Sequence, residues 1–83
     1  MAFTYMLRCA DGTFYTGWTV DINMRLAAHN AGKAARYTRC RLPVELVYYE
    51  EFPEQNAARK REAAIKKMSR RQKERLVKSD YEL

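Results

Sequence analysis

The chain has 83 residues and a formal net charge of +6, from 16 Lys and Arg against 10 Asp and Glu. This length supports one modest hydrophobic core and no separate substrate domain, so we expect a single domain over residues 1–83. No apolar run approaches the ~18 residues of a membrane span and no signal-peptide segment follows Met1, which predicts a cytoplasmic protein that makes no membrane contact.

The N-terminal segment has the pattern of a β-hairpin. Residues 3–9 alternate between two sets of side chains, which is the period of a strand. Residues 13–19 are rich in β-branched and aromatic residues and predict the second strand. Gly12 lies between the two strands and can adopt a positive φ without steric cost, which suits a tight turn.

Helical signals follow the hairpin. Asp21 is a suitable N-cap and Gly32 a suitable terminating residue, so a helix of about ten residues is expected between them. Residues 34–39 predict a second, short helical turn. Residues 44–52 are rich in β-branched and aromatic residues and predict the third strand.

The last third of the chain predicts two helices. The first covers residues 54–68 after Pro53, and its expected apolar stripe consists of Ala57, Ala58, Ala64, Ile65 and Met68. Ser69 is a suitable N-cap for a final helix from Arg70 to about Lys78, and residues 79–83 are expected to fray. The order ββα(α)βαα predicts an α+β fold, with a three-stranded antiparallel sheet flanked by helices and a core within residues 3–78.

The two cysteines, Cys9 and Cys40, do not indicate a metal site or a disulfide framework. Their separation fits no metal-ligand spacing, and a single pair in a cytosolic chain does not build a framework. We expect two reduced thiols, one of them buried in a strand.

Positive charge is concentrated in two segments. Between Arg59 and Arg75 only Glu62 and Glu74 are acidic, and residues 33–41 contain no acid. This distribution favours a nucleic acid partner over a surface that is charged only for solubility. The residues assigned to nucleic acid binding are Lys33, Arg36, Arg39, Arg41, Lys66, Lys67, Arg70 and Arg71.

The hairpin and the first helix carry candidate functional residues that each have an ordinary structural explanation. A tyrosine in a strand, such as Tyr5 or Tyr15, is most often half-buried packing. Gly17 within a strand weakens it, and usually marks a bulge or the close approach of another group. Arg25 and His29 share one helical face and form either a structural pair or part of an anion-binding cleft, with Arg on the phosphate and His carrying a proton.

Glu62 projects at the border of the apolar stripe of its helix. It is either a rim carboxylate paired with Lys66 four residues later, or a ligand for a hard divalent cation. Arg61 projects still closer to the middle of the stripe, which a snorkelling stem would explain. The sequence has no Gly-rich phosphate loop, HExxH, nucleophile elbow or CxxC, and no second acid near Glu62 at metal-ligand spacing, which disfavours a two-metal carboxylate nuclease.

Taken in order, these segments resemble the successive motifs of the GIY-YIG (URI domain) endonuclease superfamily, and most closely its small stand-alone bacterial branch. The motifs are Phe3-Thr4-Tyr5, Tyr15-Thr16-Gly17, Arg25, His29, Arg36-Tyr37-Thr38 and Arg61-Glu62-Ala63-Ala64-Ile65-Lys66. The resemblance covers residues 3–78. It departs from the family pattern in three places: the first motif keeps only its tyrosine, Thr16 replaces an isoleucine, and a late asparagine has no clear counterpart near Lys78.

The resemblance implies phosphodiester hydrolysis with a single Mg²⁺ or Mn²⁺ whose only protein ligand is Glu62. Arg25 would bind a phosphate oxygen, and Tyr5 would help to deprotonate the attacking water. A tyrosine with a pKa near ~10 is a poor base at neutral pH, so cations such as Arg25 would have to lower its pKa. The implied catalytic residues are Tyr5, Tyr15, Arg25, His29 and Tyr37, and Gly17 is the implied structural residue.

The function that follows from the resemblance is a DNA endonuclease of repair or recombination, with DNA favoured over RNA as the substrate. One alternative is a non-catalytic nucleic-acid-binding module on the same fold. Another is a domain that acts through a protein partner, which would show no salt-sensitive affinity for nucleic acid. A monomer or a weak dimer is expected.

Overall fold

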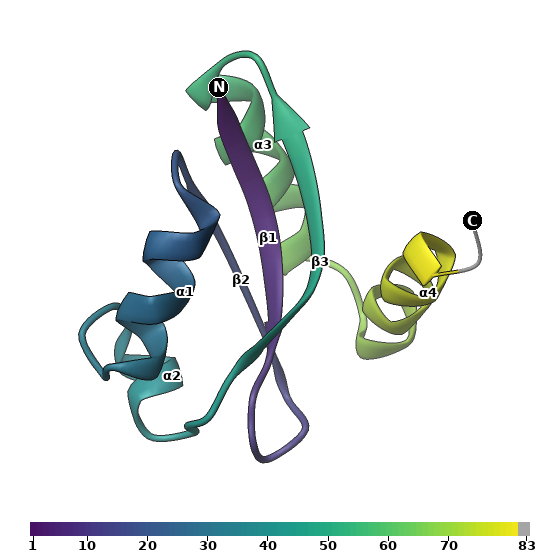
Figure 1. The fold of residues 1–83 in the computed structure, drawn as a ribbon. Helices are drawn as coiled ribbons and strands as arrows, with labels where there is room; N and C mark the ends of the chain where they lie inside the picture. Colours follow the sequence, from purple (N-terminus) through teal and green to yellow (C-terminus); the bar gives the residue numbers. More distant parts are fainter. Residues whose placement is uncertain (82–83) are drawn as a thin grey trace.

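Three antiparallel strands form the centre of the structure, a computed structural model that describes residues 1–81 (Figure 1). The strands are β1 (Ala2–Arg8), β2 (Phe14–Thr19) and β3 (Glu45–Phe52), in the order β2-β1-β3. β1 is therefore hydrogen-bonded on both sides, whereas β2 and β3 are edge strands. The predicted hairpin and third strand are confirmed, with bounds that differ by one residue at most ends.

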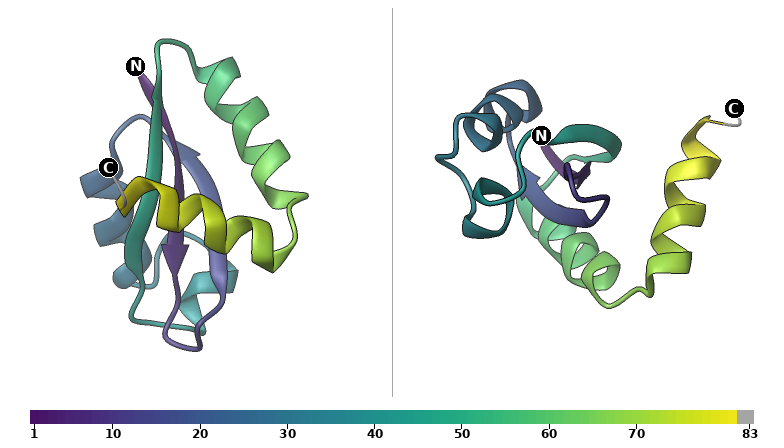
Figure 2. Two further views of the ribbon diagram at one scale, coloured as in Figure 1. Left: turned by 90° about the vertical axis from the view of Figure 1, so that its right-hand side faces the viewer. Right: turned by 90° about the horizontal axis from the view of Figure 1, so that it is seen from below.

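Helices cover both faces of this sheet, as the two views in Figure 2 show. α1 (Ile22–Asn30) and α2 (Arg36–Arg39) lie on one face, and α3 (Gln55–Lys66) and α4 (Arg70–Tyr81) lie on the other. The predicted α+β class and element order are confirmed. Within residues 1–81 no helix is long and apolar enough to cross a membrane.

The first helix begins and ends at the predicted residues. The Asp21 carboxylate accepts a hydrogen bond from the backbone N–H of Met24 at 3.0 Å, which caps the N-terminus of α1. Gly32 has a φ of +74° and terminates the helix. At the end of α1, the Asn30 side chain accepts a hydrogen bond from the N–H of Val44 at 2.8 Å and donates one to the Val44 carbonyl at 3.0 Å. This pairing ties the end of α1 to the start of β3.

Each face of the sheet packs its own hydrophobic cluster. Tyr5, Leu7, Cys9 and Val44 form the cluster under α1, with Leu26 packed against it. Met6, Val47, Ile65 and Val77 form the cluster under α3 and α4. The cysteine prediction is confirmed in that both thiols are free, although Cys9 is buried one residue beyond β1 and Cys40 is exposed.

The predicted apolar stripe of α3 is wrong at Ala64, which is exposed. Arg61 instead turns toward the sheet, where its Nε donates to Glu50 Oε2 of β3 at 2.9 Å. The Tyr48 hydroxyl donates to the same carboxylate oxygen, and burial together with Glu50 raises the pKa of Tyr48 to about 12. A partner on a distant strand therefore decides which side of the helix faces inward.

The ends of the last two helices also differ from the prediction. α3 covers residues 55–66 rather than 54–68, because Lys67 is its C-cap. α4 continues to Tyr81 rather than ending at about Lys78, and residues 82–83 lie outside the described part of the chain.

Candidate active site

The aromatic candidates from separate elements come together at the β2 edge of the sheet. The ring of His29 lies 5.8 Å from that of Tyr5 and 5.2 Å from that of Tyr15, measured between centroids. Tyr37 of α2 stacks on Tyr15 at 6.1 Å. The fold thus brings residues 5, 15, 29 and 37 into one aromatic cluster.

Gly17 lets the Tyr5 side chain extend across β2 toward this edge. The two residues are direct cross-strand partners. A Cβ atom added at Gly17 would lie 2.6 Å from the Tyr5 hydroxyl oxygen and 2.8 Å from its Cζ, so any other residue would collide with the ring. The close approach that a glycine within a strand often marks is here the approach of Tyr5.

His29 is fully buried and is hydrogen-bonded on both ring nitrogens. Its Nε2 lies 2.8 Å from the Tyr5 hydroxyl, and its Nδ1 lies 2.8 Å from the hydroxyl of Thr38. Burial lowers the pKa of His29, and the positive charge of Arg25 lowers it further. The imidazole is therefore neutral at physiological pH.

Tyr5 is also buried, and this burial raises the pKa of its phenol. The side chain of Arg25 acts in the opposite direction, while the nearby Tyr15 and Glu62 raise the pKa further. Arg25 lowers the Tyr5 pKa, as expected, but desolvation outweighs it, so the net pKa is raised. A free tyrosinate is disfavoured, and the hydroxyl retains its proton.

Arg25 lies one helical turn before His29, half-buried between Tyr5 and solvent. Its Nε atom is buried and finds no hydrogen-bond acceptor among the described residues. A buried donor without an acceptor is costly, and an ionised one more so. This position suits an anionic ligand that supplies the missing acceptor.

Glu62 reaches the same site from α3, on the other side of the sheet. Its negative charge contributes to the raised pKa of Tyr5, so it acts on the phenol from across the sheet. The Glu62 side chain is 21% exposed, and its Oε2 lies 3.3 Å from Nζ of Lys66, which is 54% exposed. The ion pair considered from the sequence is therefore present, at a carboxylate that solvent can still reach.

A groove of ≈ 380 Å³ adjoins this cluster. Its walls come from β2, α2, α3 and α4, and its lining residues are Phe14, Tyr15, Thr16, Tyr37, Lys66 and Lys73. Lys66 thus borders both Glu62 and the groove, and Lys73 adds a second cation. An extended anion that contacts Tyr15 could continue along this groove.

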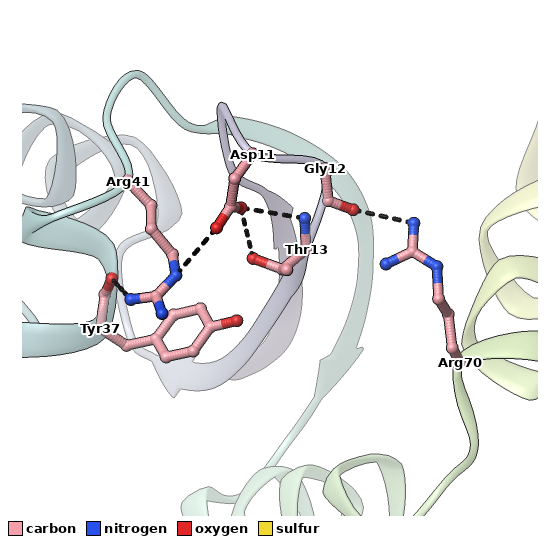
Figure 3. Close-up of polar contacts among 6 residues, drawn as sticks. All are labelled: Asp11, Gly12, Thr13, Tyr37, Arg41 and Arg70. Carbon is pink, nitrogen blue, oxygen red and sulfur yellow. Dashed lines mark hydrogen bonds and ion pairs between the residues drawn. The ribbon is translucent and has the colours of Figure 1, made fainter.

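Two of the predicted nucleic-acid-binding arginines bind the β1–β2 turn instead of remaining free, as Figure 3 shows. Arg41 donates from Nε to Asp11 at 3.0 Å and from Nη1 to the Tyr37 carbonyl at 2.9 Å, with its guanidinium 3.9 Å from the Tyr37 ring centroid. Arg70 donates to the carbonyl of Gly12 at 2.9 Å. These contacts hold α2 and α4 against the turn.

The other predicted basic residues are exposed. They are Lys33, Arg36 and Arg39 at and before α2, and Lys66, Lys67 and Arg71 at the junction of α3 and α4. The first three also line a small depression of ≈ 140 Å³ with Gly32. Their exposure leaves them able to contact an extended polyanion.

Sequence reasoning missed Thr38 and Asp11. Thr38 is fully buried against His29, and Asp11 joins Arg41 to the backbone and side chain of Thr13. Thr38 belonged to the motif Arg36-Tyr37-Thr38, in which only the tyrosine received a role. The signal available in the sequence was that Thr38, a hydroxyl residue, lies within the basic segment of residues 33–41.

Comparison with known proteins agrees with this architecture. Residues 1–75 match the family model of the GIY-YIG catalytic domain. The chain belongs to the GIY-YIG family. Within that family it is similar to UPF0213 proteins, with 57% identity to one from Streptococcus pyogenes serotype M5 over 84% of this chain and 76% of the relative. Identity to a UPF0213 protein of Natronomonas pharaonis is 53% over 90% of this chain and 88% of the relative.

Two solution NMR structures have the same fold. The UPF0213 protein BH0048 from Bacillus halodurans superposes with a TM-score of 0.60 at 44% identity, over 94% of this chain and 84% of that one. Protein EF2693 from E. faecalis superposes with a TM-score of 0.63 at 41% identity, over 98% and 86% of the two chains. The resemblance stated from the motifs and the predicted fold are both confirmed.

Proposed function

We propose that this protein is a metal-dependent endonuclease that hydrolyses phosphodiester bonds of nucleic acid, and DNA in preference to RNA. The observation that carries this proposal is the buried cluster of Tyr5, His29 and Arg25, on which Glu62 of α3 acts electrostatically from across the sheet. Arg25 keeps a buried donor there without an acceptor in the described chain. Membership of the GIY-YIG family supports the reaction class.

The residues present fit one Mg²⁺ or Mn²⁺ at Glu62. Mg²⁺ gives up its water reluctantly and often binds through one or two carboxylates plus substrate phosphate oxygens, so a single exposed carboxylate beside a phosphate site suits it. The Lys66 side chain that now contacts Glu62 is long and largely exposed, so it can move aside. When bound, the ion would stabilise the charge that develops on the phosphate and the leaving oxygen.

The other side chains of the site bind the phosphate, transfer protons and orient the substrate. Arg25 binds a non-bridging phosphate oxygen, where negative charge increases in the transition state. Tyr5 retains its proton in the ground state, so its oxygen can take a proton from the attacking water only while its own proton passes to Nε2 of His29. Their 2.8 Å separation allows that transfer. Tyr15 and Tyr37 orient the substrate and exclude water.

Exposed basic residues supply the affinity for the polyanion in this proposal. Lys33, Arg36 and Arg39 contact phosphates on the α2 side, and Lys67 and Arg71 contact them on the α3–α4 side. Binding constants should fall with salt, with log K decreasing by ~0.9 per neutralised phosphate against log salt on duplex DNA. Arg41 and Arg70 contribute mainly by holding the turn, so their loss should affect folding more than the salt slope.

A second candidate is a non-catalytic nucleic-acid-binding module. The Glu62–Lys66 ion pair favours it, because the carboxylate already has a protein partner.

For the nuclease, the proposal also includes a role in repair or recombination, a cytoplasmic location, and a monomeric or weakly dimeric state.

Glu62→Gln separates the two candidates. The amide is nearly isosteric, so the enzyme should keep its fold and its metal-free DNA affinity but lose divalent-metal-dependent cleavage, and EDTA should reproduce that loss in the wild type. Glu74→Gln is the matched control, because Glu74 forms the other i,i+4 ion pair, with Arg70. Cleavage that survives both EDTA and Glu62→Gln would exclude the metal role of Glu62.

A further inference from the structure

We infer that Thr38 is a positioning residue whose hydroxyl holds His29 in the tautomer that can accept the Tyr5 proton. The inference rests on the proposed function for its catalytic meaning, whereas the tautomer itself is a property of the folded chain. Thr38 lies in α2 and is fully buried. Because the side chain is fully buried against His29, it acts through the imidazole.

The direction of each hydrogen bond follows from the number of protons available. The Thr38 hydroxyl donates its one proton to the carbonyl of Ala35 at 3.1 Å. A carbonyl can only accept, so toward His29 the Thr38 oxygen must itself accept. The Nδ1 atom of His29, 2.8 Å away, therefore carries a hydrogen.

A neutral imidazole has only one N–H, so a hydrogen on Nδ1 leaves Nε2 with a lone pair. The Tyr5 hydroxyl, 2.8 Å from Nε2, then donates to it. The chain of donors runs from Tyr5 through His29 and Thr38 to the backbone of Ala35. Tyr5, His29 and Thr38 each donate to the next group, and the Ala35 carbonyl accepts the last hydrogen bond.

The surroundings of His29 favour this neutral form. The groups that face it are Arg25 from its own helix α1, Tyr5 from β1, Tyr15 from β2 and Thr38 from α2. Arg25 is the one charged group among them, and it is positive. An imidazolium would therefore lie buried beside a like charge, without a carboxylate in contact in the described chain.

The identity of residue 38 decides which tautomer is held. Valine has the shape of threonine but accepts no hydrogen bond, so in Thr38→Val the Nδ1 hydrogen would be buried without a partner. The imidazole would regain a hydrogen bond by moving its proton to Nε2 and donating to the Tyr5 oxygen. Tyr5 would then have no acceptor for its proton.

The chain contains one histidine, so ¹⁵N-labelled imidazole gives a single, unambiguous pair of ring resonances. We expect wild type and Thr38→Ser to show the Nδ1–H tautomer, and Thr38→Val to shift toward Nε2–H. An Nε2–H tautomer in wild type, or an unchanged tautomer in folded Thr38→Val, would overturn the inference. If Thr38→Val does not fold, the spectra of wild type and Thr38→Ser still decide it.

Cleavage kinetics supply the functional readout. In Thr38→Val, kcat should fall by about 10- to 100-fold, as for other lost partners of a functional histidine, with little change in KM. Thr38→Ser should restore most of kcat. A folded Thr38→Val with the shifted tautomer and wild-type kcat would refute the positioning role alone, whereas a wild type that cleaves no nucleic acid with Mg²⁺ or Mn²⁺ would refute the proposed function and leave the tautomer result standing.

Discussion

The two faces of the sheet differ in what they bury. Under α3 and α4 the cluster of Met6, Val47, Ile65 and Val77 is apolar, and the buried Thr4 hydroxyl on that face donates to a backbone carbonyl, that of Ala58. Under α1 and α2 the fully buried set includes His29 and Thr38, which are joined to Tyr5 by hydrogen bonds. Tyr5 and Met6 are neighbours in the sequence, yet alternation along a strand sends them to opposite faces.

The residues that stabilise the fold are therefore expected to differ from those that act in the reaction. Burying apolar groups yields stability in proportion to area, whereas buried polar groups contribute little net stability once their desolvation is counted. We therefore expect substitutions in the apolar cluster under α3 and α4 to change stability, and substitutions in the hydrogen-bonded set of Tyr5, His29 and Thr38 to change activity. The following predictions test that separation.

The largest effect is expected at Tyr5. Tyr5→Phe removes only the hydroxyl that contacts His29, so cleavage should fall by about 10²- to 10⁴-fold, the range of general acid–base catalysis. The melting temperature should change little. Tyr49→Phe is the matched control, because Tyr49 is the cross-strand partner of Tyr5 on β3 and is half-exposed. Equal losses in the two variants would contradict the assignment.

Ile65→Ala should have the opposite profile. Ile65 is fully buried in the apolar cluster, so truncation should cost about 2–5 kcal/mol of unfolding free energy. Denaturant unfolding measures this loss, and the specific activity of the folded fraction should remain near that of wild type. Met24→Ala removes a side chain that is 70% exposed and should be nearly neutral. A stable but inactive Ile65→Ala would break the separation.

Gly17→Ala should lower both stability and activity, because Gly17 packs directly against the Tyr5 side chain. The added Cβ would come within 2.6 Å of the Tyr5 hydroxyl, and relief of such overpacking typically costs about 1–3 kcal/mol. The displaced hydroxyl should also lose its contact with His29, so cleavage should fall. In a Tyr5→Phe background the same substitution should cost less, since the nearest clashing atom is absent. Additive effects in the double variant would argue against this contact.

A smaller effect is expected in the pH dependence of stability. Burial and Arg25 hold the pKa of His29 below its ordinary value of 6.5, so between the two pKa values the unfolded chain binds more protons. The contribution of neutral His29 to the free energy of unfolding is fully present above pH 6.5, and it is lost as pH falls through the folded-state pKa. Thermal melts of wild type and His29→Gln should diverge over this window. Parallel curves below pH 6.5 would contradict a buried neutral His29.

Local sequence signals predicted much of the fold. The hairpin with Gly12, the Asp21 cap and the Gly32 terminator depend on neighbouring residues, and all are present in the structure. The motif order also pointed to Tyr5, Arg25 and Glu62 together, and in the structure Arg25 and Glu62 both act electrostatically on Tyr5. These features follow from short-range stereochemistry or from family membership.

The remaining features depend on contacts that the sequence does not display. Helical projection brought Arg61 toward the stripe of α3, but it did not show that Glu50 of β3 is its partner or that Ala64 is exposed. Arg70 binds the Gly12 carbonyl 58 residues away, which no charge pattern shows. The raised pKa of Tyr5 likewise depends on how deeply α1 covers it. Tertiary packing decides each of these.

The central claim is that the polar cluster at the β2 edge serves a bound phosphate and not the fold. Arg25→Lys tests it most directly, because lysine keeps the charge but loses the forked donors. Cleavage and thermal unfolding should be measured on the same samples, with Arg39→Lys on the exposed side of α2 as the control. The account predicts a melting temperature near that of wild type and a cleavage rate lower by about 10²-fold or more. Unfolding with undiminished specific activity in the folded fraction would show that Arg25 is structural and would contradict the account.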